Sequence, residues 1–127
     1  MLAVLDTNIL VSAIWSKNSN PGKLLDLAVA KRITLCYDSR MMEEYRSVLY
    51  RPRLRFSEVE VFELLDFIEA KGLVVAPEPL AVPFTDESDR KFYEAAKACG
   101  AILVTGNLKH YPAEPGIVSP AGFLQLL

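Results

Sequence analysis

The stretch LAVLDTN, residues 2–8, joins four apolar residues directly to a carboxylate, a hydroxyl and an amide. A short run that is apolar at every position is typical of a strand buried on both faces, as in a parallel sheet. We therefore predict a strand over residues 2–5 and a short helix over residues 9–15. The polar residues then lie at the carboxyl end of the strand, where open parallel sheets place their functional sites.

The rest of the chain alternates strand-like apolar runs with amphipathic helical patterns, and the proline-rich residues 77–83 form a surface connection. Side-chain oxygens that can cap the free N–H groups of a helix stand at Asn20, Ser39 and Ser57. We expect further strands at 33–37, 73–76, 101–105 and 116–118, and helices at 21–32, 40–50, 58–71, 86–100 and 120–127. The alternation predicts an α/β fold with a mainly parallel sheet of four to five strands, in a single domain over residues 1–127.

The composition excludes several classes of protein. The 127 residues are 51% hydrophobic, and 14 Lys and Arg against 16 Asp and Glu leave a net charge of −2, so the chain is no globally basic nucleic-acid binder. Two cysteines without a CxxC motif and a single histidine indicate neither a disulfide framework nor a zinc site. Without a long apolar run or a signal peptide, we expect a cytoplasmic protein that binds no membrane.

Three polar residues follow predicted strands and are the first candidates for a site: Asp6, Asp38 and Asn107. On the helix over 40–50, Glu44 borders the apolar stripe, whereas Glu43 lies nearly opposite it.

On the helix that begins near Asp86, Asp89 shares the inward face with Phe92. Arg90, Lys91, Glu94 and Lys97 are expected to point elsewhere. Asp6, Glu44 and Asp89 are then three acids that turn toward the interior.

Buried carboxylates repel one another and lose hydration, so a group of them calls for a compensating cation. Oxygen ligands without histidine or cysteine suit Mg²⁺ or Mn²⁺, and such ions often complete their shell with a substrate phosphate. A simpler interpretation stays open: Asp6, Asp86 and Asp89 can each cap a helix, Asp86 above all, and Glu44 can lie in solvent at a helix edge.

A basic segment offers a candidate surface for RNA. Apolar and aromatic residues separate its four arginines, a pattern that suits a phosphate backbone and a stacked base and equally suits a solvated surface. The four are Arg46, Arg51, Arg53 and Arg55. Lys109 and His110 follow a predicted strand and could also contact phosphate, although a lone histidine is more often structural.

Three segments together resemble the PIN-domain ribonucleases over essentially the whole chain. They are VLDTNILVSAI at residues 4–14, SRMMEEYRSVLYRPRL at 39–54 and TDESDRKFYEAAKACGAILVTGNLKHYP at 85–112. The resemblance implies a three-layer α/β/α, PIN-like (Rossmann-like) fold. It also implies that Asp6, Glu44 and Asp89 are the catalytic acids that hold Mg²⁺ or Mn²⁺, with Glu43 as the competing second acid and Asp86 as an accessory.

One position departs from the family pattern. Many PIN domains carry a fourth acid directly after Thr-Gly, and this chain has Asn107 there, which keeps an oxygen acceptor but drops a charge. A tightly held second metal is therefore in doubt, although VapC-like toxins often read Thr-Gly-Asn. By the same resemblance Thr105 positions a water or an acid, and Asn8 orients Asp6.

The function implied by the resemblance is metal-dependent endonucleolytic hydrolysis of single-stranded RNA. Relatives of the toxin type belong to toxin-antitoxin pairs, so the resemblance further implies a homodimer and a small antitoxin protein as a partner. The alternative is a catalytically inactive RNA- or protein-binding module on the same fold, for which Asn107 is the support.

Overall fold

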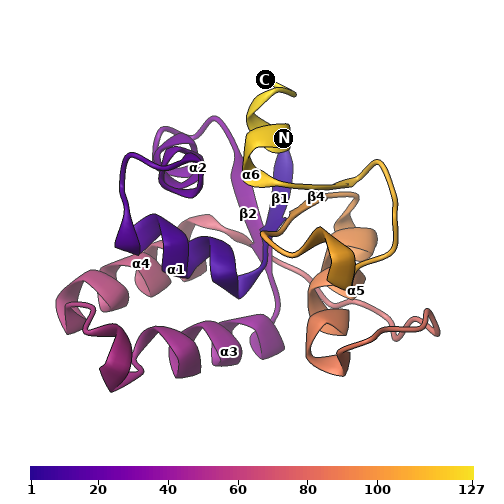
Figure 1. Ribbon diagram of the computed structural model, residues 1–127, viewed down its shortest axis with the longest axis horizontal. Helices are drawn as coiled ribbons and strands as arrows, with labels where there is room; N and C mark the ends of the chain where they lie inside the picture. The colour runs from indigo at the N-terminus through magenta and orange to yellow at the C-terminus, as the bar shows by residue number, and fades with distance from the viewer.

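Five parallel strands form the central sheet in the order β3-β2-β1-β4-β5, and Figure 1 labels the middle three, β2, β1 and β4. The computed structural model describes residues 1–127. Its strands are β1 (Leu2–Leu5), β2 (Thr34–Tyr37), β3 (Leu73–Val74), β4 (Ile102–Val104) and β5 (Ile117–Val118). The predicted parallel sheet is confirmed, and the buried β1 lies at its centre, as expected for a strand that is apolar throughout.

Helices cover both faces of the sheet and make three layers. α5 packs on β1, β2 and β4 from one side, while α1, α2 and α4 lie on the other side of the strands (Figure 1). The helices are α1 (Thr7–Trp15), α2 (Asn20–Val29), α3 (Ser39–Leu49), α4 (Glu58–Lys71), α5 (Arg90–Cys99) and α6 (Pro120–Leu124). Three single 3₁₀ turns join them: η1 (Pro52–Leu54), η2 (Glu87–Asp89) and η3 (Leu108–His110).

Two of the three predicted caps were placed one residue too late. Ser19, not Asn20, accepts a hydrogen bond from the backbone N–H of Gly22, and Asp38, not Ser39, accepts one from Met41 at 2.9 Å. In both places two neighbouring residues are good capping types, so the sequence leaves the start of the helix open by one position. The cap at Ser57 is confirmed by its bond from the N–H of Glu60.

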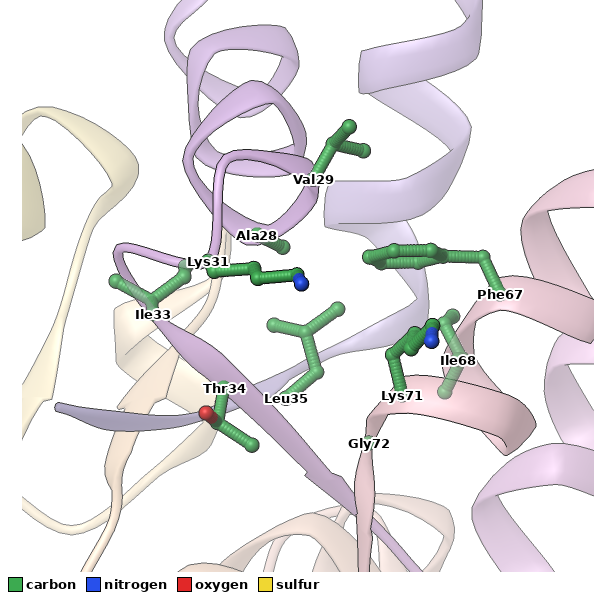
Figure 2. A pocket seen from close by; sticks show the side chains of 10 residues that line it. All are labelled: Ala28, Val29, Lys31, Ile33, Thr34, Leu35, Phe67, Ile68, Lys71 and Gly72. Atoms are coloured by element: carbon green, nitrogen blue, oxygen red, sulfur yellow. The ribbon is translucent and has the colours of Figure 1, made fainter.

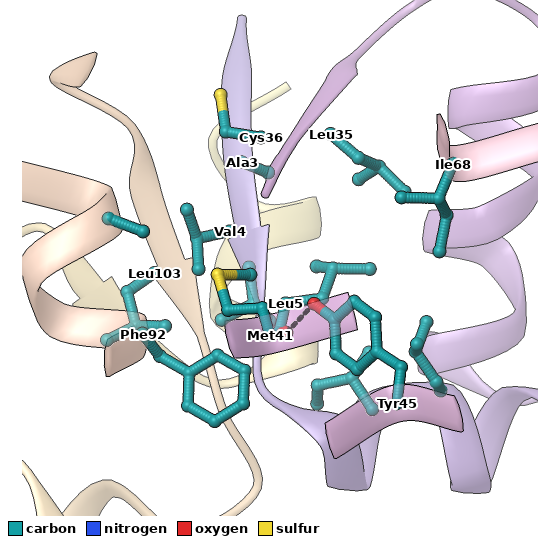
Figure 3. Packing of buried hydrophobic residues seen from close by; sticks show 14 of the residues in the cluster. Ala3, Val4, Leu5, Leu35, Cys36, Met41, Tyr45, Ile68, Phe92 and Leu103 are labelled. Atoms are coloured by element: carbon teal, nitrogen blue, oxygen red, sulfur yellow. Dashed lines mark hydrogen bonds between the residues drawn. The ribbon is translucent and has the colours of Figure 1, made fainter. Parts of the chain in front are cut away.

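The core brings α3 and α5 beneath the carboxyl end of β1. The buried Tyr45 hydroxyl donates a hydrogen bond to the carbonyl of Leu5, the last residue of β1 (Figure 3). Tyr45 also stacks on the buried Phe92 of α5, with ring centroids 6.3 Å apart. This contact places Glu44, the neighbour of Tyr45 on α3, beside the residue that follows β1.

The proline-rich connection between β3 and α5 lies on the surface, as predicted, and contains neither helix nor strand over residues 75–86. Side chains of α5 hold it at Leu80. The Leu80 N–H donates to Glu94 at 2.8 Å, and Arg90 donates to the Leu80 carbonyl at 2.6 Å. α5 also holds it at Phe84, whose ring packs edge-on against Tyr93 with centroids 5.4 Å apart and lies 4.9 Å from the Arg90 guanidinium. We call residues 75–86 the strap.

Both cysteines are free thiols, in agreement with the sequence. Burial raises the pKa of Cys36 to about 12, which keeps this thiol protonated and unreactive. No helix has both the length and the apolar character that a bilayer crossing requires.

Candidate active site

Asp6 lies at the carboxyl end of β1 and is almost fully buried. Its N–H continues the sheet by donating to Val104, but its carboxylate caps no backbone N–H of α1. Instead Oδ2 accepts hydrogen bonds from the hydroxyls of Thr105 at 2.9 Å and Tyr111 at 3.0 Å. Asp6 is thus the N-cap residue of α1 by position, but the hydrogen bonds of its carboxylate come from Thr105 and Tyr111.

Burial raises the pKa of Asp6 above its usual 3.8, and the nearby charge of Glu44 raises it further. The hydrogen bonds from Thr105 and Tyr111 lower the same pKa in part, because they stabilise the ionised form. Burial also raises the pKa of Tyr111, so this hydroxyl stays protonated and remains a donor to Asp6. Two neutral donors thus hold Asp6 in place without neutralising its charge.

Asp89 ends η2, immediately before α5, and its carboxylate is largely covered. Its Oδ2 is buried and accepts no hydrogen bond, although His110 Nδ1 lies 3.3 Å away. The pKa of Asp89 is raised by burial first and then by the charges of Asp6 and Asp86, while His110 lowers it in part. Asp6 and Asp89 are therefore close enough to repel each other, and neither has a full cationic partner.

Glu44 on α3 is the third acid, and it differs from the other two. Its carboxylate accepts a hydrogen bond from the hydroxyl of Thr7 and forms an ion pair with Lys91 at 2.7 Å. Glu44 is half-buried and Glu43 is exposed, as the helical pattern predicted. Lys91 was expected to point elsewhere, but its long side chain reaches across from α5 and only 15% of it is exposed.

The four supporting residues occupy different parts of this region. Thr105 contacts Asp6 directly, and its hydroxyl also accepts a hydrogen bond from the N–H of Asn107. Asn8 accepts a hydrogen bond from the N–H of Gly106 and so holds the loop after β4, with no side-chain bond to Asp6. Asp86 is exposed and caps η2 through Ser88, which lowers its pKa.

The acids fit a divalent cation by donor type and charge. One buried oxygen of Asp89 has no hydrogen-bond partner, and the pKa values of Asp6 and Asp89 are raised. A bound cation would contact that oxygen and lower both pKa values. However, no three Asp, Glu, His or Cys side chains lie close enough together to hold an ion as they stand. Glu44 is the residue that would have to move, since Lys91 and Thr7 engage both of its oxygens.

A second group of buried acids lies near the end of the neighbouring strand, β2, and has a cationic partner. Asp38 follows β2, and Arg40 binds it at 2.7 Å and Glu94 at 2.8 Å. The prediction that Glu94 points away from the interior was wrong: only 4% of its side chain is exposed. Because Arg40 and the Leu80 N–H satisfy it, Glu94 is a structural acid. Asp38 is structural as well, since it caps α3 and pairs with Arg40.

The four arginines of the basic segment do not meet the acids as a group. All four are exposed, and Arg46 pairs with Glu69 on α4 at 3.2 Å. Arg51 alone shares a hollow with Glu44 and Lys91. Arg53 and Arg55 belong to the η1 region, beyond the end of α3. Their binding of RNA stays a prediction.

The hollow in Figure 2 lies away from this chemistry. It has a volume of about 320 Å³ between the end of α2, the start of β2 and α4, and Lys31 and Phe67 extend into it. Two lysines line it, and Thr34 carries its one side-chain hydroxyl. None of the lining residues is Asp, Glu, His or Cys. It lies at the amino end of β2, opposite the edge that carries Asp38, so we do not assign it to the site.

Sequence reasoning missed three residues that contact the acids: Thr7, Lys91 and Tyr111. Thr7 directly follows Asp6, and its bond to Glu44 depends on how α1 packs against α3. Lys91 stands two positions after Asp89 on a helix, a spacing that a helical wheel places on another face. Only the length of its side chain brings it to Glu44. Tyr111 follows a 3₁₀ turn, and its approach to Asp6 across 105 residues of sequence depends on the packing of the loop after β4. No local pattern carries that information.

Comparisons with known proteins identify the family and the fold. The family model of the PIN domain matches residues 3–109. An uncharacterized protein of Methanocaldococcus jannaschii is 29% identical over 107 residues, which are 82% of this chain and 69% of that protein. A solved structure is similar in fold: VapBC2 from Rickettsia felis, bound to a DNA fragment from their promoter. The match has a TM-score of 0.59 at 21% identity and covers 94% of this chain and 97% of the other. Because the family model spans most of the sequence, the chain belongs to the PIN domain family.

Proposed function

We propose that the protein is a metal-dependent endoribonuclease that hydrolyses phosphodiester bonds of single-stranded RNA. The observation that carries the proposal is the pair of buried acids, Asp6 and Asp89: no cationic side chain contacts Asp6, and His110 at 3.3 Å compensates Asp89 only in part. An incompletely compensated anionic pair at the carboxyl edge of a parallel sheet is costly for the fold alone and suits a site that takes up a cation.

Asp6, Glu44 and Asp89 would hold the ion, which we propose is Mg²⁺ or Mn²⁺. Thr105 and Tyr111 orient Asp6, and Asn8 fixes the loop that presents Thr105. Glu44 would bind the ion once its ion pair with Lys91 is broken. Asp86, which is exposed, would add negative charge near Asp89 without binding the ion. When bound, the ion would supply activation of a water nucleophile and neutralisation of charge on the phosphate.

We further propose that residues 1–127 form a single PIN domain that acts as the toxin of a toxin-antitoxin pair. The fold shared with VapBC2 of Rickettsia felis supports a small antitoxin protein as a partner. We expect a homodimer, because relatives of the toxin type usually dimerise. Light scattering on the purified protein measures its mass, and a monomer at micromolar concentration would contradict the homodimer.

The direct test is cleavage of a generic single-stranded RNA with Mg²⁺ or Mn²⁺, beside a sample in EDTA. Asp6→Asn is the informative variant, because the amide oxygen can still accept the bonds from Thr105 and Tyr111 while the charge is lost. Asp26→Asn is the matched control, since Asp26 is an exposed acid on α2. We expect cleavage by the wild type and by Asp26→Asn, and none with EDTA or Asp6→Asn.

The rival function is a catalytically inactive RNA- or protein-binding module on this fold. Two observations favour it: the acids do not form a three-ligand group, and Asn107 replaces the family's fourth acid. Calorimetry separates the two functions. Mg²⁺ or Mn²⁺ binding that Asp6→Asn abolishes supports the nuclease, whereas no metal binding and no cleavage by the wild type supports the inactive module.

A further inference from the structure

A polar hollow of about 400 Å³ adjoins the acids on the side of β4 and β5. It is formed by residues 105–110 and Ser119, and we call it the Lys109 hollow. Only Leu108 among these residues is apolar, and none is acidic. Such a surface offers no binding energy to an apolar ligand, and its one lysine gives it positive charge. Its chemistry therefore suits a hydrated anion.

Two side chains in this hollow are entirely free to bind a ligand. Lys109 is exposed and forms no ion pair, and the side-chain amide of Asn107 makes no hydrogen bond within the protein. Thr105 donates its hydroxyl to Asp6, whereas the Ser119 oxygen accepts the N–H of Gly122 and keeps its own proton free. The side chains of the hollow thus offer an ammonium, an amide and the Ser119 hydroxyl as free donors.

The hollow is joined to the acids by two of its own residues. Thr105 bonds to Asp6 at 2.9 Å, and His110 lies 3.3 Å from Asp89. A ligand seated against Lys109 and Asn107 is therefore a direct neighbour of whatever Asp6 and Asp89 hold. An extended nucleic acid strand repeats its phosphates at short intervals, so one phosphate at the acids places the next within reach of this hollow.

The hollow on the other side of the acids is larger but electrostatically satisfied. It has about 630 Å³ and is lined by Arg40, Arg51 and Lys91 together with Glu43 and Glu44. Arg40 is bound to two buried acids, and Lys91 is bound to Glu44. Only Arg51 has no partner, and Glu43 offsets it. This side therefore attracts a phosphate less than the Lys109 hollow does.

We propose that the Lys109 hollow binds the phosphate of single-stranded RNA adjacent to the bond that is cut, with Lys109 and Asn107 as its contacts. The proposal rests on the nuclease function proposed above. It also gives Asn107 a role: a carboxylate at this position would stand beside Lys109 and repel the phosphate, whereas the amide donates to it. The asparagine is then a substrate contact and no longer only a weakened metal ligand.

The test is binding of a labelled uridine oligonucleotide of about twelve nucleotides, measured by fluorescence anisotropy in EDTA at low salt. Without metal there is no cleavage, so affinity is read separately from activity. Lys109→Ala should weaken binding about tenfold and reduce the salt dependence by about one released ion. Lys23→Ala removes the same charge from an exposed position on α2 and should leave the affinity unchanged.

Asn107 gives a second, charge-specific test. Asn107→Asp should weaken binding at least as much as Lys109→Ala, whereas Asn107→Ser, which keeps a polar neutral group, should have a small effect. Both residues are exposed, so these variants should fold, and their thermal unfolding should match that of the wild type.

Each outcome separates this site from the proposed nuclease. If Lys109→Ala and Asn107→Asp lose affinity but the wild type cleaves nothing with Mg²⁺ or Mn²⁺, the phosphate site stands and the nuclease falls. If the wild type cleaves RNA but Lys109→Ala binds as Lys23→Ala does, the phosphate site falls alone. A wild type that does not bind the oligonucleotide at all also overturns the phosphate site.

Discussion

Two pairs of acids lie at the carboxyl edge of the same sheet, and the protein treats them differently. Asp38 and Glu94 enclose Arg40, which binds both within 2.8 Å, so their charges are satisfied. Asp6 and Asp89 have no such cation: Asp6 has two neutral hydroxyl donors, and one oxygen of Asp89 has no donor. We refer to them as the paired acids and the unpaired acids.

The difference shows which feature of a buried acid indicates function. Burial alone does not, because Asp38 and Glu94 are at least as buried as Asp6 and Asp89. What separates them is the missing counter-charge: burial raises the pKa of both unpaired acids, and no full cationic partner in the protein offsets it. Part of their stabilisation is therefore left to a ligand. Glu44 is intermediate, since Lys91 neutralises it by a pair that is partly exposed.

The largest expected effect comes from making the same substitution in each pair. Asp6→Asn should reduce RNA cleavage at least about 100-fold, because it removes a charge that the cation needs. Asp38→Asn should reduce cleavage far less, since its oxygen can still cap α3. Initial rates with Mn²⁺ measure both variants. Equal losses of activity would erase the functional distinction between the two pairs.

Removal of the Arg40 guanidinium should destabilise the folded protein around the paired acids. Arg40→Met leaves Asp38 and Glu94 buried together without compensation, and we expect a loss of about 3 kcal/mol in the free energy of unfolding. This lies at the lower end of the usual range, because nearly half of the Arg40 side chain is exposed. Urea unfolding measures it. Arg46→Met is the control: its pair with Glu69 is exposed on both sides and should be worth less than about 0.5 kcal/mol.

The pH dependence of stability should reveal the unpaired acids. Folding raises the pKa of Asp6 above 3.8, so its contribution is fully present below that pH and is lost as the pH rises through the higher folded value. In EDTA, Asp6→Asn should therefore gain stability relative to the wild type between about pH 4 and pH 7. The gain should grow across this interval, as more of the wild-type Asp6 ionises. A difference between the two proteins that stays constant with pH would show that Asp6 ionises without penalty.

The smallest effect concerns the intermediate acid. Lys91→Gln should free Glu44 and tighten Mg²⁺ binding a few-fold in calorimetry, because a competing cation is removed from the site. The free energy of unfolding should fall by less than about 1 kcal/mol, since this ion pair is partly exposed. Weaker Mg²⁺ binding in Lys91→Gln would mean that Lys91 organises Glu44 for the metal and does not compete with it.

Periodic patterns of apolar residues predict the parallel sheet and the inward face of α3, and the resemblance to PIN domains implies the three layers. The sequence also brings Asp6, Glu44 and Asp89 forward as candidates, since each lies at a strand end or on an inward helix face. It cannot predict which acids are paired. Arg40 reaches Glu94 across 54 residues, and Lys91 reaches Glu44 through a long side chain. Tertiary packing and side-chain length decide these contacts, and neither has a local signature.

The strap has a consequence for the exchange of backbone amide hydrogens. Within residues 75–86, Leu80 gives its N–H to Glu94, the same acid that Arg40 binds. The Leu80 amide should therefore exchange slowly with solvent, at a rate set by opening of the Asp38, Arg40 and Glu94 group, while the exposed amides around it exchange freely. The exchange rate of the Leu80 amide thus reports whether the ion pairs of Arg40 with Asp38 and Glu94 are formed.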